Sequence, residues 1–186
     1  MSVLCRGRRQ AARRLSGRQG FTLIELIVTL AVAAIIAAIG LPAMQQLINA
    51  NRLNGQAEEL SSAIQLARSE AVRTAAPVTI CGSDDGTTCA DSDEWSRMII
   101  RGRNNLASDE AASEVIAVYR DVTLPAGIQM SGPVAGVTFR PSGLSAAQAT
   151  ITLCIPTTRP AQNQRVVTIL ISGAARTTRN DGAGEC

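Results

Sequence analysis

The chain has 186 residues, which is enough for one folded domain and an appendage. It contains no histidine, and therefore lacks the most common general base, zinc ligand and partner of a nucleophilic serine or cysteine. An enzyme is disfavoured on this ground. Aromatic residues make up only 2% of the chain, so the core must consist mainly of valine, isoleucine, leucine and alanine.

The formal net charge of +3 is unevenly distributed. Six of the 18 basic residues precede an apolar run that begins at Phe21, whereas all 15 acidic residues lie from Glu25 onward. Without its first 20 residues the chain would carry a net charge of −3. The bulk charge of the remainder therefore does not predict a large nucleic-acid-binding surface.

Residues 1–20 are polar and rich in arginine, which is typical of a cytoplasmic tail or leader. Residues 21–48 are apolar, and as a helix they could cross a hydrocarbon core of roughly 30 Å. We therefore expect a membrane helix. An ordinary cleaved secretory signal is the alternative, because 38–40 is a small-x-small triplet. The apolar run, however, exceeds the usual h-region of about 7–15 residues.

The helix is expected to continue beyond residue 48 to about residue 75, where Ala76 and Pro77 close it. Apolar residues recur there at helical spacing, at Leu53, Leu60, Ile64, Ala67 and Ala71. Gly40 and Pro42 lie at the join between the two halves. Because Pro42 has no amide to bond to the carbonyl of Ala38, we expect a bend or local melting of the helix there.

After Pro77 the pattern changes to short β-like runs separated by turn-rich segments. The predicted strands are 77–81, 97–101, 114–120, 122–130, 136–140, 150–155 and 165–172. The expected fold class is α+β. A long N-terminal helix, with a membrane half and an amphipathic half, packs on an antiparallel β-rich head formed by residues 49–186.

The segment GFTLIEL, residues 20–26, resembles the class III signal of type IV prepilins and type II secretion pseudopilins. This resemblance implies that a prepilin peptidase cleaves after Gly20 on the cytoplasmic side and methylates the new amine of Phe21. Residues 1–20 would then be the cleaved leader. Glu25 would be the fifth residue of the mature chain.

The remainder is similar to the GspH/FimT branch of minor pilins, through AIQLARSEAVRTAAPVTIC, EWSRMII, VTFRPSGLS and TITLC. The resemblance implies a pilin-like fold and a single-pass inner-membrane protein with a periplasmic head, which later enters a pilus at the cell surface. The implied partners are other minor and major pilins, the prepilin peptidase and the inner-membrane assembly platform. No cofactor is implied.

The leading hypothesis is a minor pilin, a structural subunit that helps to initiate assembly of a type IV pilus near its tip. A type II secretion pseudopilin is an alternative with the same architecture. An enzyme anchored by its N-terminus is the outlying interpretation, since no nucleophile–base pair or metal cluster supports it.

Glu25 stands inside the apolar run, where an ionised carboxylate costs roughly 2.5–3.5 kcal/mol near a bilayer centre. The family resemblance implies that the amine of processed Phe21 on an adjoining subunit offsets this cost and sets the axial register. The alternative is a carboxylate that snorkels to the interface. Thr22 either helps to satisfy this polar cluster or is an ordinary helix residue.

Four cysteines remain beyond Cys5 of the leader, and they allow three pairings. We favour Cys81 with Cys89 and Cys154 with Cys186. Four free thiols and a tetrathiolate zinc site are the alternatives, although no close C-x-x-C pair supports zinc, and we predict no metal site.

An acidic loop holds Asp84, Asp85, Asp91, Asp93 and Glu94. It lacks the frame of a known calcium loop, so we expect a solvated surface there.

The tail SGAARTTRNDGAGEC raises the question of DNA. The resemblance to DNA-uptake members of this branch implies a C-terminal G-R-x-R element, whose arginines contact the phosphates of the DNA backbone. Here Gly173 is followed by two alanines, and the remaining candidate contacts are Arg159, Arg165, Arg176 and Arg179. A pilus-tip DNA receptor for natural transformation is therefore an alternative hypothesis, and a solvated strand end is favoured.

Overall fold

A computed structural model describes residues 20–103 and 115–186, and these form two compact units that divide between Leu41 and Pro42. The predicted leader upstream of Gly20 lies outside the described residues. The elements, in chain order, are α1 (Leu23–Thr74), β1 (Val78–Gly82), β2 (Arg97–Arg103), β3 (Val115–Thr123), β4 (Gln129–Ser131), β5 (Val137–Phe139), β6 (Ala149–Cys154), β7 (Gln164–Ile169) and β8 (Ala175–Asn180).

Helix α1 is helical through Gly40 and Pro42, so the helix does not melt at these residues, and the alternative of a bend there stays a prediction. Proline removes only one backbone donor, and the hydrogen bonds of the turns on either side can carry the helix past it. The helix ends at Thr74 because Ala75 adopts a left-handed conformation, with φ of 51°, and Pro77 follows two residues later.

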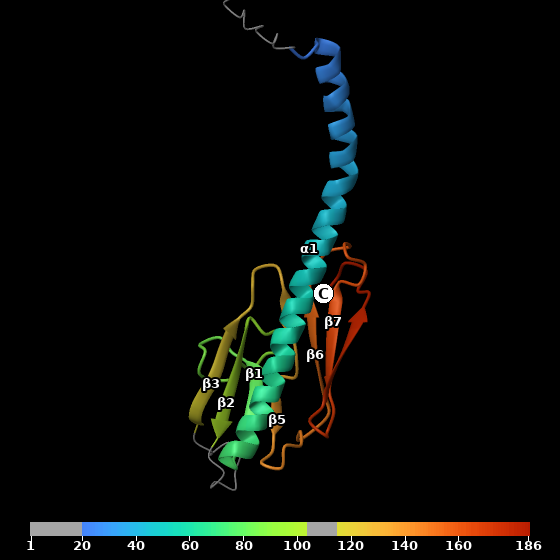
Figure 1. Ribbon diagram of the computed structural model, residues 1–186. Coiled ribbons are helices and arrows are strands. Elements are labelled where there is room, and N and C mark those ends of the chain that lie inside the picture. The colour runs from blue at the N-terminus through green and yellow to red at the C-terminus, as the bar shows by residue number, and fades with distance from the viewer. Residues whose placement is uncertain (1–19, 104–114) are drawn as a thin grey trace, which may run out of the picture. The chain divides into compact units, whose positions relative to one another are not determined.

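The head contains two antiparallel sheets, and the part of α1 after residue 42 lies against them (Figure 1). The strand order is β3-β2-β1-β5 in the first sheet and β4-β6-β7-β8 in the second. An ion pair between Arg120 of β3 and Glu59 of α1 also joins the first sheet to the helix. The expected class, a long N-terminal helix followed by antiparallel sheet, is confirmed.

Two strand predictions differ from the structure. The predicted strand 122–130 is wrong, because β3 ends at Thr123 and a turn closed by the Ile128 amide on the Pro125 carbonyl precedes β4. Strand β8 was missed. Its sequence, ARTTRN, has no apolar alternation because all six residues are exposed at the edge of the second sheet.

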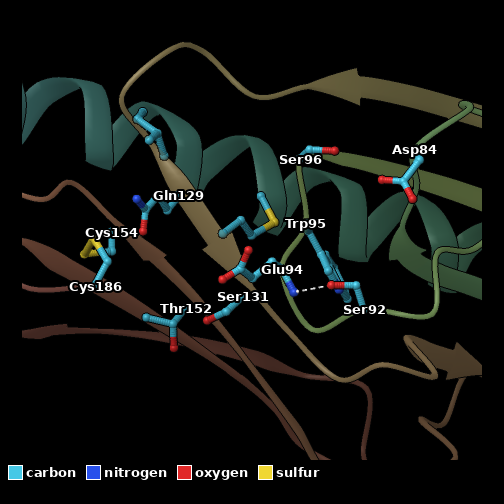
Figure 2. Close-up of a pocket in the computed structure, with 12 residues that line it drawn as sticks. Asp84, Ser92, Glu94, Trp95, Ser96, Gln129, Ser131, Thr152, Cys154 and Cys186 are labelled. Atoms are coloured by element: carbon cyan, nitrogen blue, oxygen red, sulfur yellow. Dashed lines mark hydrogen bonds between the residues drawn. A yellow bond between two sulfur atoms is a disulfide. The ribbon is translucent and has the colours of Figure 1, made fainter.

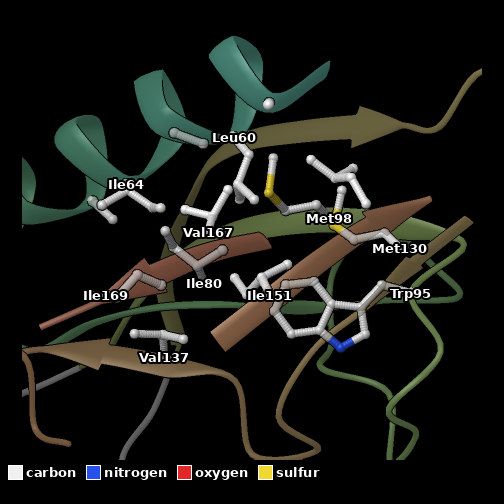
Figure 3. Packing of buried hydrophobic residues seen from close by; sticks show 14 of the residues in the cluster. Leu60, Ile64, Ile80, Trp95, Met98, Met130, Val137, Ile151, Val167 and Ile169 are labelled. Atoms are coloured by element: carbon white, nitrogen blue, oxygen red, sulfur yellow. The ribbon is translucent and has the colours of Figure 1, made fainter. Parts of the chain in front are cut away.

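The core of the head joins α1 to both sheets. All five residues of the predicted apolar stripe are buried, and in Figure 3 Leu60 and Ile64 face Ile80 of β1 and Val167 of β7. Full burial of such a side chain contributes about 1.5–3 kcal/mol. The second half of α1 is therefore an integral part of the head.

Candidate functional site

The apolar side chains of the first half of α1 have no cover within the described residues. Phe21 and Leu23 are each 80% exposed, and large apolar side chains remain exposed as far as Ile48. By length and composition this helix is able to cross a membrane. Lipid or other protein must cover such a surface in the cell.

Thr22 is the N-cap of α1, a role that neither sequence interpretation gave it. It precedes the first helical residue, its Oγ1 accepts a hydrogen bond from the Glu25 amide at 3.3 Å, and its carbonyl accepts one from the Leu26 amide. The signal was present in the sequence as the T-x-x-E spacing of residues 22–25. Glu25 therefore lies in the first helical turn, where the helix dipole favours a negative charge.

The head contains the disulfides Cys81–Cys89 and Cys154–Cys186, which are the pairings favoured from the sequence. Asn163 supports the second of these. Its side chain is fully buried, donates to the carbonyls of Ile155 and Glu185, and accepts from the Gly182 amide at 2.8 Å. The last residues are therefore held on the head by polar contacts as well as by the disulfide, which no sequence motif indicated.

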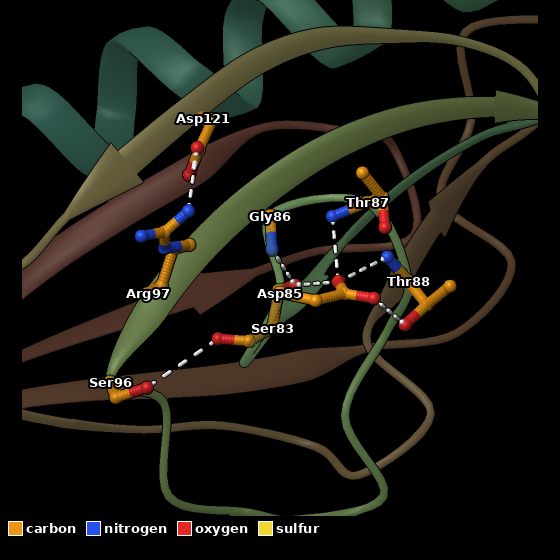
Figure 4. A network of polar contacts seen from close by, with 8 residues as sticks. All are labelled: Ser83, Asp85, Gly86, Thr87, Thr88, Ser96, Arg97 and Asp121. Carbon is orange, nitrogen blue, oxygen red and sulfur yellow. Dashed lines mark hydrogen bonds and ion pairs between the residues drawn. The ribbon is translucent and has the colours of Figure 1, made fainter.

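Asp85 organises the loop that the Cys81–Cys89 disulfide closes (Figure 4). Its Oδ1 accepts hydrogen bonds from the amides of Thr88 and Thr87, each at 2.7 Å, and its Oδ2 accepts one from the Thr88 hydroxyl at 2.8 Å. Because these donors favour the ionised form, the hydrogen bonds from Thr88 and then Thr87 hold the pKa of Asp85 well below its usual range. Both oxygens of this carboxylate are thus engaged by the loop itself.

Arg165 is not a surface residue, so its assignment as a possible DNA contact is wrong. Its side chain is buried, its Nε donates to Asn54 Oδ1 of α1 at 2.9 Å, and its Nη1 donates to the carbonyls of Gln162 and Gln164. Burial, with a smaller contribution from nearby Arg179, lowers the pKa of the Arg165 guanidinium. The alternation of strand β7 gives the reason, since Arg165 shares its inward face with Val167 and Ile169.

The other three candidate arginines are exposed but are not gathered on one surface. Arg179 pairs with Arg165 in register and, with Thr177, lines a groove of about 310 Å³ between β8 and α1. Arg176 pairs with Thr168 and projects from the opposite face of the sheet. Arg159 lies in the loop before β7, where its carbonyl accepts a hydrogen bond from Asn49.

A pocket of about 560 Å³ lies beside β4, lined by the connection between β1 and β2 and by β4 and β6 of the second sheet (Figure 2). Glu94 is bridged to Ser131 of β4, and these residues line the pocket together with Trp95, Gln129 and the Cys154–Cys186 disulfide. Its lining offers carboxylates, hydroxyls and amides for hydrogen bonding, without a nucleophile–base pair among the residues that form it.

Trp95 forms a structural wall of this pocket. A Cβ atom on Gly132 would lie 2.6 Å from one edge of the indole, and one on Gly82 would clash with the other. The two glycines therefore leave the space that the chain's single tryptophan fills.

Two family models match the chain. The model of the type II transport protein GspH matches residues 56–175, and that of the prokaryotic N-terminal methylation motif matches residues 15–41. A comparison with curated protein sequences gives no match.

The chain is also similar to solved structures. It shares 23% identity with the type IV minor pilin FimU of Pseudomonas aeruginosa, over 72% of this chain and 96% of FimU, with a TM-score of 0.52. It shares 16% identity with the minor pseudopilin EpsH of the Vibrio cholerae Type 2 Secretion System, over 69% of this chain and 97% of EpsH, with a TM-score of 0.49. Since the GspH model covers well over half of the sequence, directly after a methylation motif, the chain belongs to the GspH family of minor pilins and pseudopilins.

Proposed function

We propose that the chain is a minor pilin of a type IV pilus, a structural subunit without enzymatic activity that helps to initiate assembly near the tip. Members of its family are structural subunits that assemble with other pilins or pseudopilins. The observation that carries the proposal is the continuity of α1. Its first half overlaps the methylation-motif match at residues 15–41 and has an exposed apolar surface, and its second half forms part of the core of the head.

In this proposal, residues 1–20 are the leader, residues 21–48 are the membrane and assembly segment, and residues 49–186 are the periplasmic head. A prepilin peptidase cuts after Gly20 and methylates Phe21. The partners are that peptidase, the inner-membrane assembly platform, and the other minor and major pilins. The exposed apolar side chains support the assignment of the segment, because either lipid or the helices of other subunits can cover them.

Glu25 is proposed to pair with the methylated amine of Phe21 on an adjoining subunit. Its place in the first turn of α1 supports this pairing, because the carboxylate lies close to the end of the helix where that amine would be generated. A charge pair of this kind contributes only when both partners are present, since one unpaired buried charge is strongly destabilising. The contact would therefore select correctly registered subunits.

The test is to recover the chain from sheared pili of cells that express it with an epitope tag in the head. We expect a product shortened by 20 residues, with a methylated N-terminal Phe21 in the mass spectrum, and fewer pili in a deletion strain. Replacement of Gly20 by a bulky residue should leave the unprocessed precursor in the membrane. Mature protein of normal size in that variant, or unchanged pili in the deletion strain, would contradict the proposal.

A second candidate is a pseudopilin of a type II secretion system, which the GspH family model favours by its description. The two candidates differ in what a deletion removes. Loss of secreted proteins from the medium with normal pili would support the pseudopilin, whereas loss of pili with normal secretion supports the minor pilin.

A further inference from the structure

We propose that the end of the head at which α1 terminates is a docking surface for the head of a neighbouring, different pilin subunit that presents an apolar side chain flanked by carboxylates. The inference rests on the proposed function as a fibre subunit. The surface consists of Val72, Leu144 and Ile171, which we call the terminal patch. The contact would be additional to the one proposed at Glu25.

Three segments that are distant in sequence converge to form the terminal patch. Val72 is 54% exposed, Leu144 43% and Ile171 59%. The Ser145 amide donates to the Ile171 carbonyl at 2.9 Å, and a Cβ atom on Gly143 would lie 3.3 Å from Val72 Cγ2. The two turns and the end of the helix therefore adjoin one another.

The terminal patch is held in place by its own backbone. The turn before Leu144 is closed by the Gly143 amide on the Arg140 carbonyl, and the turn after β7 by the Gly173 amide on the Leu170 carbonyl, each at 2.8 Å. A Cβ atom on Gly173 would lie 2.5 Å from the Gly143 carbonyl, so the two turns touch closely. A preorganised surface loses little conformational entropy when a partner binds.

The charges around the terminal patch are mainly positive. Arg68 and Val72 line a groove of about 480 Å³ on α1, and Arg140 lies in the turn that carries Leu144. None of the ion pairs within residues 20–103 and 115–186 involves Arg68 or Arg140, whereas Arg73 pairs with Glu70. An apolar centre with two such cations at its rim is complementary to an apolar side chain between carboxylates.

Val134 provides a matched contrast on the same head. It is 46% exposed, which is similar to Val72, but it lies in the turn whose Gly132 amide donates to the carbonyl of Asp93, next to Glu94. An exposed valine is thus also present in a turn that follows a segment paired with two acidic residues, Asp93 and Glu94. The charge of the rim distinguishes the terminal patch from this second site.

Photo-crosslinking of the full-length chain in piliated cells tests the proposal. Benzoylphenylalanine is placed at position 72, at position 144 or, as the control, at position 134. We expect adducts from positions 72 and 144 with a different pilin of the same fibre, joined at a peptide that contains aspartate or glutamate, and at least several-fold less from position 134. Adducts with a second copy of this chain alone, with phospholipid alone, or equally from all three positions would overturn the proposal.

Charge variants provide the second measurement. Val72→Asp and Arg140→Glu should each reduce the amount of the chain in sheared pili roughly tenfold, because each places a negative charge against the expected carboxylates. Val134→Asp should change it less than about twofold, and the membrane pool of all three variants should match the wild type. Equal incorporation of the three variants would overturn the inference. Absence of the wild-type chain itself from pili would instead refute the proposed function.

Discussion

Arg176 and Arg179 lie on opposite faces of β8, although only two residues separate them. Arg179 is in register with buried Arg165 and faces the groove next to α1, whereas Arg176 is in register with Thr168 on the outer side of the sheet. A single run of DNA phosphates on one face of the sheet therefore cannot be reached by both side chains.

DNA binding by the soluble head, from about residue 49, should accordingly be weak. In a gel-shift titration we expect an apparent Kd no tighter than about 10⁻⁶ M at physiological salt, which is the range of non-specific binding. Arg176→Ala and Arg179→Ala should each change it less than about threefold. Tight, steeply salt-dependent binding that disappears when both arginines are replaced would instead favour the DNA receptor.

Arg165 should be required for stability. Arg165→Ala removes the donor from Asn54 Oδ1 and from two carbonyls in a buried site, and unsatisfied buried acceptors of this kind cost about 1–3 kcal/mol. We expect the free energy of unfolding of the head, measured by urea denaturation, to fall by about this amount. The matched control is Arg176→Ala on exposed β8, which should stay within about 0.5 kcal/mol of the wild type. A loss of similar size in both variants would contradict the structural role.

The parts of the fold with strong periodicity could be predicted from the sequence. The stripe from Leu53 to Ala71 recurs at helical spacing, and the burial of those residues follows directly from it. Strand β8 could not be predicted, because a strand exposed on both faces needs no apolar alternation and is defined only by its pairing with β7.

The polar residues were predicted less well than the apolar ones. Arginine is usually exposed, so the burial of Arg165 depends on Asn54, which is 111 residues away in sequence. The contacts of Asn163 likewise exist only once the chain end is folded back. Thr22 is the exception. Its capping role is local and could have been recognised from the spacing to Glu25.

Glu25 and Thr22 should differ in their effects on assembly. Glu25→Ala should leave cleavage after Gly20 intact and reduce the chain in sheared pili strongly, since it removes one member of the proposed charge pair. Thr22→Ala should remove the cap, at a cost of about 1 kcal/mol, and reduce incorporation only modestly, while Thr22→Ser retains the hydroxyl and should behave as the wild type. Immunoblots of membranes and sheared pili measure both steps. Wild-type incorporation of Glu25→Ala would refute the pairing.

Asp85 should make the stability of the head dependent on pH under acidic conditions. Its folded-state pKa lies below the ordinary aspartate value of about 3.9, chiefly because the amides of Thr88 and Thr87 donate to it. The stabilisation is therefore fully present above about pH 4 and is lost as the pH falls from there through the folded-state pKa. Asp85→Asn should lower the Tm most near pH 7, and the difference from the wild type should shrink as the pH falls below about 4.

Asp91→Asn, an exposed change in the same acidic loop, is the control and should shift the Tm little at any pH. A difference between Asp85→Asn and the wild type that stayed constant from pH 7 to pH 2.5 would show that the carboxylate charge does not stabilise this loop.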